Sequence, residues 1–153
     1  MRSPDSTTLA YIAGFLDDDG SIFFQIVSRP DYKLKFQIRS SIAFYQDTTQ
    51  VRILEWLKEI FGAGYIRHRK TGISDYTIVE PKEVQKILEL LKPYTKLKNK
   101  QIELGLEILE KLQGKKSKEE FLEICKLVDK FKELNYSKKR TINYEVVKGS
   151  LSP

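Results

Sequence analysis

The sequence predicts an α+β domain, with an α-β-β-α-β-β-α core that carries an antiparallel sheet and with further helices at the C-terminus. Two pairs of short segments alternate between apolar and polar residues, and each pair is joined by a turn, as in β-hairpins. Segments with apolar residues at helical spacing precede, separate and follow the two pairs. The length of 153 residues suits one domain, which we expect over residues 1–153 with a core at about 6–140 and a helical tail at about 141–153.

The first half of the chain begins with a mostly apolar segment that Asp5 or Ser6 can cap as a helix. After a turn at residues 29–31, apolar and polar residues alternate strictly along the chain. The apolar set, which we expect to face the core, is Leu34, Phe36, Ile38, Ile42 and Phe44. The elements expected here are a helix over residues 6–16, strands over 21–28 and 32–45, and a helix over 48–61 that ends at the glycines of 62–64.

The second half begins with a hairpin expected over residues 65–79, which turns at 70–72. Its inner face is expected to carry Ile66, Tyr76 and Ile78, and its outer face Arg67, Arg69, Asp75 and Thr77. Pro81 suits the first turn of a helix that ends before Pro93. Ser117 and Glu120 form a capping box that opens another helix. The other helices are expected over residues 99–112 and 142–151.

The composition limits the classes of function. There are 27 Lys and Arg against 21 Asp and Glu, and a net charge of +6 with a pI near 9.3 favours an anionic partner such as nucleic acid, although it also serves solubility alone. Cys125 and His68 are each alone in the chain, which excludes an intramolecular disulfide, a Cys/His zinc site and a Ser-His-Asp triad. No long apolar stretch and no signal peptide is found, so we expect an intracellular protein without a membrane span.

The outer face of the predicted sheet is polar and strongly basic. Arginine, glutamine and aspartate can contact base edges, and lysine can contact phosphates, so this face suits reading a nucleic acid. The alternative is a plain solvated face, but that explains less well why one acid stands among at least five bases. The residues concerned are Gln25, Lys33, Lys35, Gln37, Arg39, Arg67, Arg69 and Asp75.

Small side chains form a stripe on the first predicted helix. Ala10, Ala13 and Gly14 stand at helical spacing and share one face. Such a stripe lets a second helix approach closely, and a glycine inside a helix costs about 1 kcal/mol relative to alanine, so it needs a packing reason. We therefore predict that this helix packs against its own copy in a homodimer.

Three acids, Asp17, Asp18 and Asp19, stand at the C-terminal end of this helix, where the macrodipole opposes negative charge. The arrangement favours a cation site, and hard oxygen ligands suit Mg²⁺. The alternative is an Asx turn before Gly20. In a homodimer the two Asp19 carboxylates would meet at the two-fold axis, where they could support two-metal phosphodiester hydrolysis of a pseudo-palindromic site.

The segment AYIAGFLDDDGS, residues 10–21, closely resembles the motif of the LAGLIDADG homing endonucleases. The segment GYIRHR at 64–69 and the segment PYTKLK at 93–98 also resemble that family, in its single-motif homodimeric branch. The resemblance implies staggered cleavage of a long double-stranded DNA target. It also implies two or more Mg²⁺ per dimer, with Mn²⁺ as a substitute and Ca²⁺ supporting binding without cleavage.

The resemblance also implies residue roles. Asp19 would be the metal ligand, assisted by the backbone carbonyl of Asp18, a position where glycine is more usual in the family. Gln46 would orient water and Lys98 would neutralise charge near the scissile phosphate, although Lys98 taken alone is one of four lysines on a solvated or phosphate-binding segment. A basic residue often stands at the position of Gln50, so the basic pocket is weaker here unless Arg52 substitutes.

The resemblance further places DNA contacts on the sheet and on a later basic loop. We expect Trp56 to serve packing and His68 to be structural or exposed. The expected DNA-binding residues are Gln25, Arg29, Tyr32, Lys33, Lys35, Gln37, Arg39, Arg67, Arg69, Asp75, Thr77, Lys138, Lys139 and Arg140.

The expected mechanism is in-line attack by a metal-bound water without a covalent intermediate. The motif offers no obvious side-chain general base, so a water network is expected to accept the proton. Two other functions remain open. One is an RNA-binding maturase on the same scaffold, with intron RNA as a partner. The other is a DNA-binding regulator without catalysis, whose activity the substitution Asp19→Asn would leave intact.

Overall fold

The computed structural model describes residues 3–135 and 142–152. Four antiparallel strands form one sheet, and the second hairpin pairs with the first through β2 and β4. The strands are β1 (Gly20–Ser28), β2 (Phe36–Asp47), β3 (Tyr65–His68) and β4 (Ile73–Ile78), in the spatial order β1-β2-β4-β3. The predicted α+β class and antiparallel sheet are therefore confirmed.

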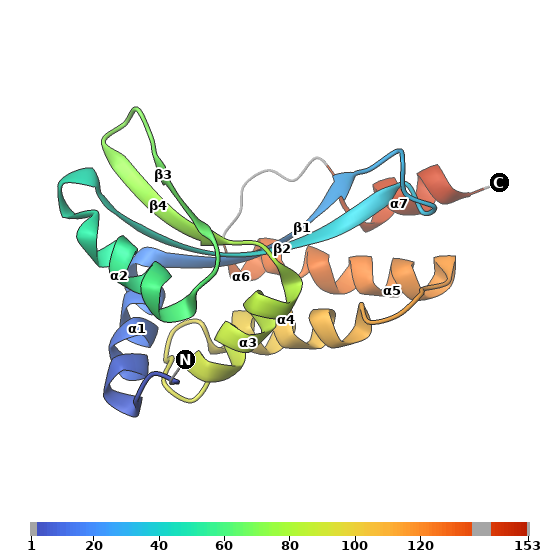
Figure 1. Ribbon diagram of the computed structural model, residues 1–153. Coiled ribbons are helices and arrows are strands. Elements are labelled where there is room, and N and C mark those ends of the chain that lie inside the picture. The colour runs from blue at the N-terminus through green and yellow to red at the C-terminus, as the bar shows by residue number, and fades with distance from the viewer. Residues whose placement is uncertain (1–2, 136–141, 153) are drawn as a thin grey trace.

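The helices lie mainly against one face of this sheet. Figure 1 shows α1, α3, α4 and α5 below the strands, with α1 at the end of the molecule and α7 beside α5. Among the described residues, no helix is long and apolar enough to cross a membrane. The helices are α1 (Ser6–Asp19), α2 (Arg52–Phe61), α3 (Pro81–Leu91), α4 (Asn99–Lys111), α5 (Lys118–Asp129), α6 (Phe131–Leu134) and α7 (Tyr144–Leu151), with a 3-10 turn η1 (Thr48–Gln50) before α2.

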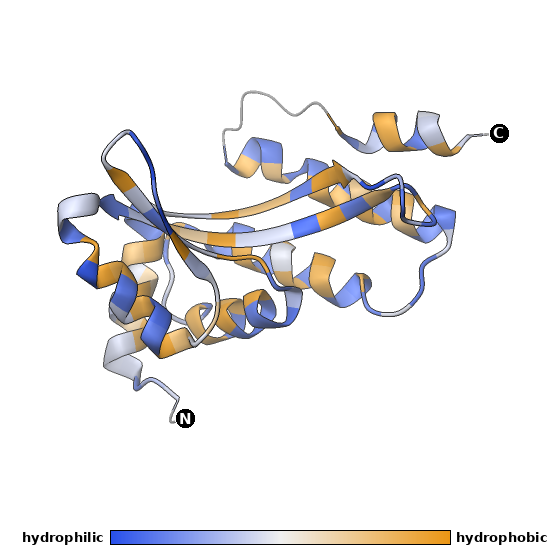
Figure 2. Ribbon diagram, turned by 45° about the horizontal axis from the view of Figure 1, so that its top comes forward, coloured by the Kyte–Doolittle hydropathy of each residue, from blue (hydrophilic) through white to orange (hydrophobic). Residues whose placement is uncertain are grey.

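The core lies between these helices and the covered face of the sheet. Hydrophobic and hydrophilic residues alternate along the strands in Figure 2, so that each strand gives one set of side chains to the core. Phe24, Phe44 and Tyr76 are fully buried, and the rings of Phe44 and Tyr76 stack at 6.1 Å. The predicted inner residues of both hairpins are buried or packed on the core, which confirms the registers expected from alternation.

Most predicted helix boundaries are also confirmed by their local chemistry. Asp5 caps α1 by accepting from the backbone N–H of Thr8 at 2.8 Å. Gly62 ends α2 in the left-handed conformation, and Pro81 opens α3. Ser117 and Glu120 form both hydrogen bonds of the predicted capping box.

Several boundaries differ from the prediction, among them the start of α2, which is Arg52 instead of residue 48, and two of the differences bear on the functional site. Helix α1 continues to Asp19 instead of ending at residue 16, because contacts from a distant loop offset the charge at its end, as described below. The second strand begins at Phe36 instead of Tyr32, because residues 29–35 form a hydrogen-bonded turn in which Lys35 adopts a φ of 65°. Tyr32, Lys33 and Lys35 therefore lie on a turn at the end of the sheet and not on its face.

Candidate active site and nucleic-acid interface

The C-terminal end of α1 passes directly into β1 and presents two of the three acids. Gly20 donates its backbone N–H to the carbonyl of Leu16, and a Cβ at this glycine would lie 2.9 Å from the Leu16 Cα. Only glycine therefore fits where the helix turns into the strand. Asp18 and Asp19 are exposed and line an open depression together with Gln46.

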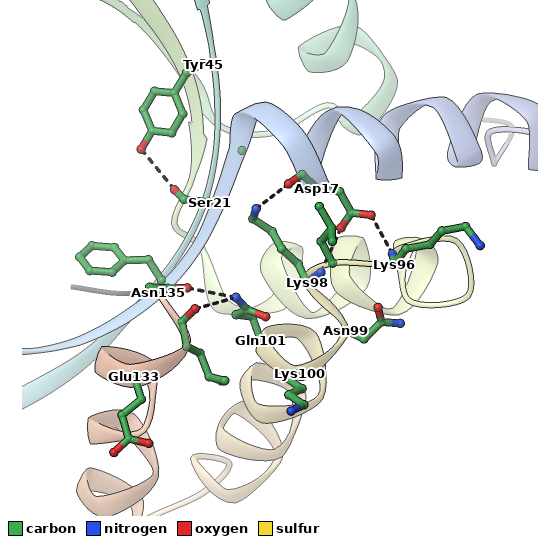
Figure 3. A pocket seen from close by; sticks show the side chains of 14 residues that line it. Asp17, Ser21, Tyr45, Lys96, Lys98, Asn99, Lys100, Gln101, Glu133 and Asn135 are labelled. Carbon is green, nitrogen blue, oxygen red and sulfur yellow. Dashed lines mark hydrogen bonds between the residues drawn. The ribbon is translucent and has the colours of Figure 1, made fainter.

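Asp17, the first of the three acids, has a different environment. Its carboxylate oxygens accept the backbone N–H groups of Lys96 at 2.7 Å and Lys98 at 3.1 Å. The Lys98 ammonium in turn donates to the backbone carbonyl of Asp17 at 2.8 Å (Figure 3). The alternative of an Asx turn does not hold for Asp17, because its carboxylate binds a segment about 80 residues further along the chain.

The two exposed acids suit a hard divalent cation. Asp18 and Asp19 offer carboxylate oxygens on an open surface, which is the donor type that Mg²⁺ prefers. Within the described part of the chain, no three His, Cys, Asp or Glu side chains come together as a metal site. The donor set therefore fits Mg²⁺ in chemistry, but one chain alone leaves the set incomplete.

Gln46 and Gln50 line the same depression as Asp19. Gln46 is half-buried near the end of β2, and its side-chain oxygen accepts the backbone N–H of Asp47 at 2.9 Å. Arg52 is exposed on the first turn of α2 and is not among the residues that line the depression. The expectation that Arg52 could replace a basic residue at position 50 is therefore not supported by its position.

A basic recess of about 900 Å³ lies beside this depression and is drawn in Figure 3. Lys96 and Lys98 line it from the segment that leads into α4, and Lys100 lines it from the first turn of that helix. Ser21 and Tyr45 line it from the sheet. Three lysines so close to the acids at the end of α1 provide positive charge for a phosphate group next to a candidate metal site.

Side-chain amides hold the helical wall of this recess. Asn135 donates to the backbone carbonyl of Ile22 at 2.7 Å, and Gln101 donates to the backbone carbonyl of Leu134 at 3.2 Å. The hydrogen bond of Asn135 therefore anchors the chain at this residue to β1. The predicted basic loop of Lys138, Lys139 and Arg140 begins just beyond this anchor and lies outside the described residues.

The uncovered face of the sheet carries several of the predicted nucleic-acid contacts. Arg39 is exposed, and Gln25 stands opposite it in the β1–β2 register. Arg29 donates to Gln37 at 2.9 Å, forms an ion pair with Asp31 at 3.0 Å, and has its guanidinium 4.3 Å from the centroid of the Tyr32 ring. These contacts hold Arg29 in place at the end of the sheet.

Asp75 and Thr77 are not exposed on this face, which corrects the expectation that they contact bases. The Asp75 side chain has no exposed surface, and its carboxylate accepts from Arg69 at 3.0 Å, Arg67 at 3.4 Å and Thr77 at 2.6 Å. Burial alone would raise the pKa of Asp75, but these hydrogen bonds and the two arginine charges outweigh it, so the pKa is lowered from its ordinary value. Asp75 therefore holds the two arginines, and Arg67 and Arg69 remain about half exposed.

Tyr45 was not assigned a role from the sequence. Its hydroxyl lies 3.2 Å from the hydroxyl of Ser21, and the Arg69 guanidinium lies 5.8 Å from its ring centroid. Its Cα pairs with that of Asp75 across the β2–β4 ladder, so Tyr45 connects the arginine pair to the start of β1. The alternation of the second predicted strand could have indicated this, since Tyr45 shares the polar face with Arg39 and Ser41.

The stripe of small residues on α1 is only partly exposed. Ala13 is fully buried in the core of its own chain, so it is not available to a partner helix and its assignment to the dimer interface is wrong. Ala10 and Gly14 are exposed, and a Cβ at Gly14 would meet nothing within 4 Å. The part of the chain that the structure describes therefore supplies no packing reason for Gly14.

Two minor expectations, for His68 and Trp56, agree with the structure, and the single cysteine is buried. Cys125 is fully buried, and burial raises the pKa of its thiol to about 12. His68 is exposed, with its Nδ1 2.8 Å from the Ser74 hydroxyl. Trp56 packs on the core and makes an edge contact with Tyr11 at 5.8 Å. None of these three side chains lines the depression beside Asp19.

The fold is that of a family of nucleases. The chain belongs to the LAGLIDADG endonuclease family, whose model matches residues 12–106. The DNA endonuclease I-CvuI of Chlorella vulgaris is 42% identical over 147 residues, which make up 96% of this chain and 91% of that protein. The DNA endonuclease I-CreI of Chlamydomonas reinhardtii is 41% identical over 144 residues, or 94% of this chain and 88% of that protein.

Solved structures agree with this assignment. The crystal structure of I-CvuI in complex with its target in the presence of Ca superposes with a TM-score of 0.90 at 43% identity, covering 95% of this chain and 92% of that one. A second structure of I-CvuI, with the I-CreI target in the presence of Mg and with the DNA not cleaved, matches equally well. The archaeal intron-encoded I-Vdi141I shares the fold, with a TM-score of 0.84 at 19% identity.

Proposed function

We propose that this chain is a site-specific homing endonuclease that makes a staggered double-strand break in a long, pseudo-palindromic DNA target by metal-dependent hydrolysis. The observation that carries the proposal is the position of Asp18 and Asp19. They lie at the end of α1, beside a lysine-lined recess and at one edge of a sheet face that presents arginines. This arrangement can bind a cation, a phosphate and base edges at once.

Duplex DNA is the substrate that the relatives support. I-CvuI has been crystallised with DNA targets in the presence of Ca and of Mg. At 42% identity over almost the whole chain, we carry over to this protein both the DNA substrate and the use of a divalent cation. An intracellular location is part of the proposal, because the protein must share a compartment with its target.

The residues at the site have separate proposed roles. Asp19, assisted by the backbone carbonyl of Asp18, holds Mg²⁺, for which Mn²⁺ substitutes. When bound, Mg²⁺ supplies Lewis-acid stabilisation of the charge that develops on the phosphate oxygens. Lys98 neutralises negative charge at the scissile phosphate, and Gln46 orients a water molecule near it. Arg39, Arg67 and Arg69 contact bases and phosphates along the sheet, as do the other exposed polar residues of this face.

A homodimer is part of this proposal. Cutting both strands requires two sets of acids, and each chain has one motif. Two large apolar side chains near the acids are exposed in the single chain, Tyr11 at 56% and Leu97 at 74%. Together with the open surface at Gly14, they support an interface along α1 whose two-fold axis brings two Asp19 residues together.

Selection from a randomised duplex library tests the proposal. The protein is incubated with the library in Mg²⁺, in Ca²⁺ and in EDTA, and bound and cut molecules are sequenced. We expect a long pseudo-palindrome that is bound in Ca²⁺ and cut at its centre only in Mg²⁺. Asp19→Asn should bind the same site and leave it intact.

Two results would overturn this assignment. Full cleavage activity in the Asp19→Asn variant would show that Asp19 is not a required metal ligand. Binding without cleavage in any metal would instead favour a regulator, or a maturase that binds intron RNA. Structured intron RNA would then be offered in competition with the duplex to separate these two functions.

A further inference from the structure

Asp17 and Lys98 hold each other through both backbone and side-chain groups. The Asp17 carboxylate accepts the backbone N–H groups of Lys96 and Lys98, and the Lys98 ammonium donates to the backbone carbonyl of Asp17 (Figure 3). Two of these three contacts are short, at 2.7 and 2.8 Å. The segment that enters α4 is therefore attached to the last turn of α1 at three points.

These hydrogen bonds pair backbone groups that the end of α1 and the start of α4 leave without a partner inside the helix. The last carbonyls of a helix have no partner within it, and its C-terminal end is negative, so the Lys98 ammonium is well placed on the carbonyl of Asp17. The N-terminal end of α4 is positive, and its cap residue, Lys98, has no side chain that can accept a hydrogen bond. The Asp17 carboxylate, from a different helix, accepts the N–H group of this cap residue and brings a matching negative charge to this end of α4.

The contacts also link the position of the Lys98 ammonium to that of Asp19. Asp17 stands two residues before Asp19 on the same helical turn, and Lys98 lines the basic recess beside them. Lys98 is a long, flexible side chain, so its ammonium has many alternatives when nothing holds it. A fixed carbonyl acceptor, together with a fixed backbone, restricts the ammonium to one side of the acids.

We propose that Asp17 is a positioning residue for cleavage, which acts by setting where the Lys98 ammonium lies relative to Asp19. This inference rests on the proposed function. It assigns to the first acid of the triplet a role separate from metal binding, because each Asp17 oxygen already accepts an N–H group. Loss of the carboxylate should slow the chemical step and leave DNA and metal binding in place.

A double-mutant cycle on the full-length protein tests this directly. Asp17→Asn replaces one accepting oxygen by an NH₂ group, which cannot accept from an N–H group. We expect the single-turnover cleavage rate to fall about 10- to 100-fold, because small displacements of a positioned group cost about this much. In the Lys98→Ala background the same substitution should reduce the rate less than about threefold, because its effect passes through Lys98.

Binding measurements separate this role from the alternatives. The dissociation constant for the target in Ca²⁺ and the half-saturating Mg²⁺ concentration should each change less than about threefold, as for a group that acts on the chemical step alone. Asp5→Asn is the matched control, since Asp5 also caps a helix through one backbone N–H group but lies at the far end of α1. It should cleave at the wild-type rate.

The outcomes are distinguishable. If Asp17→Asn does not fold, as judged by thermal unfolding, the same cycle is run with Asp17→Glu, which keeps the charge. Independent, multiplying effects of Asp17 and Lys98 would overturn the inference, and so would a large rise in the Mg²⁺ requirement, which would make Asp17 a metal ligand. Failure of the wild-type protein to cut any duplex would instead overturn the proposed function.

Discussion

The carboxylate of Asp75 accepts a hydrogen bond from Nε of Arg69 at 3.0 Å, although the Asp75 side chain has no exposed surface. The same carboxylate holds Arg67, and the Arg69 guanidinium lies near the ring of Tyr45. A buried acid thus fixes the direction in which two arginines leave the sheet. Rigid placement matters for base contacts, because a bidentate contact depends on the angle at which the guanidinium arrives.

Replacing Asp75 should loosen this pair of arginines. We expect Asp75→Asn to lower the free energy of unfolding by about 1–2 kcal/mol, since a buried carboxylate loses charge-assisted hydrogen bonds while the half-exposed arginines return to water. Selection on the duplex library should also show relaxed base preference at the positions that Arg67 and Arg69 contact. Chemical denaturation and library sequencing measure the two effects.

Asp31→Asn is the control for this substitution. Asp31 pairs with Arg29 at a similar distance of 3.0 Å, but it is 64% exposed. We expect its free energy of unfolding to remain that of the wild type. An equal decrease in the free energy of unfolding of the two variants would show that the burial of Asp75 does not add to the stability.

The stability that Asp75 supplies should depend on pH. Its pKa is lowered in the folded protein, so its ionised form is stabilised by folding. The contribution is complete above the ordinary carboxyl pKa of 3.8 and is lost as the pH falls below that value through the lowered pKa. Denaturation of the wild type and Asp75→Asn over this range should give curves that converge in acid, and a constant difference would contradict the assignment.

The open surface at Gly14 predicts that its substitution affects assembly and not folding. Gly14→Glu should keep the fold and gain about 0.5–1 kcal/mol of stability as a monomer, since a glycine inside a helix is replaced and its new Cβ meets no described atom within 4 Å. We expect analytical ultracentrifugation to show a monomer that does not cleave. Gly149→Glu, at a similarly open helical site on α7, should remain a dimer.

Two glycines with nearly equal backbone angles should differ in their response to alanine. Gly64 has a φ of +90°, and a Cβ there would lie 2.5 Å from the carbonyl oxygen of Thr77. Gly72 has a φ of +87° with open space around it. We expect losses of about 3 kcal/mol or more for Gly64→Ala and about 1 kcal/mol for Gly72→Ala, because only the first adds a backbone clash to the strain. Urea denaturation compares them, and similar losses would contradict the close approach at Gly64.

The position of Gln50 predicts how a positive charge at the site would act. Gln50 lines the depression that holds Asp19, so Gln50→Arg should add a phosphate contact and steepen the dependence of log affinity on log salt concentration by about 0.9. Cleavage in Mg²⁺ should also become faster. Arg52→Gln, outside the depression, should leave both quantities unchanged, and a large effect there would show that Arg52 does reach the DNA centre.

Much of the fold could be predicted because it depends on short-range patterns. Alternation placed Phe36, Ile38 and Ile42 in the core, and the capping box at Ser117 marked the start of α5. The prediction was wrong where contacts distant in sequence decide the outcome. Ala13 shares a helix face with Gly14 by spacing, yet the packing of α1 on the sheet buries Ala13 and leaves Gly14 open.

The sequence by itself determined the two hairpins, the basic sheet face and the presence of three acids at the end of the first helix, because periodicity and charge are local properties of the chain. Only the tertiary structure decided what each acid does. The Asp17 carboxylate accepts N–H groups 79 and 81 residues away, and the Asp75 carboxylate accepts from two arginines. The Asp18 and Asp19 carboxylates line an open depression and have no partner among the described residues. All four residues carry the same carboxylate group, and the role of each depends on which hydrogen-bond donors the fold places next to it.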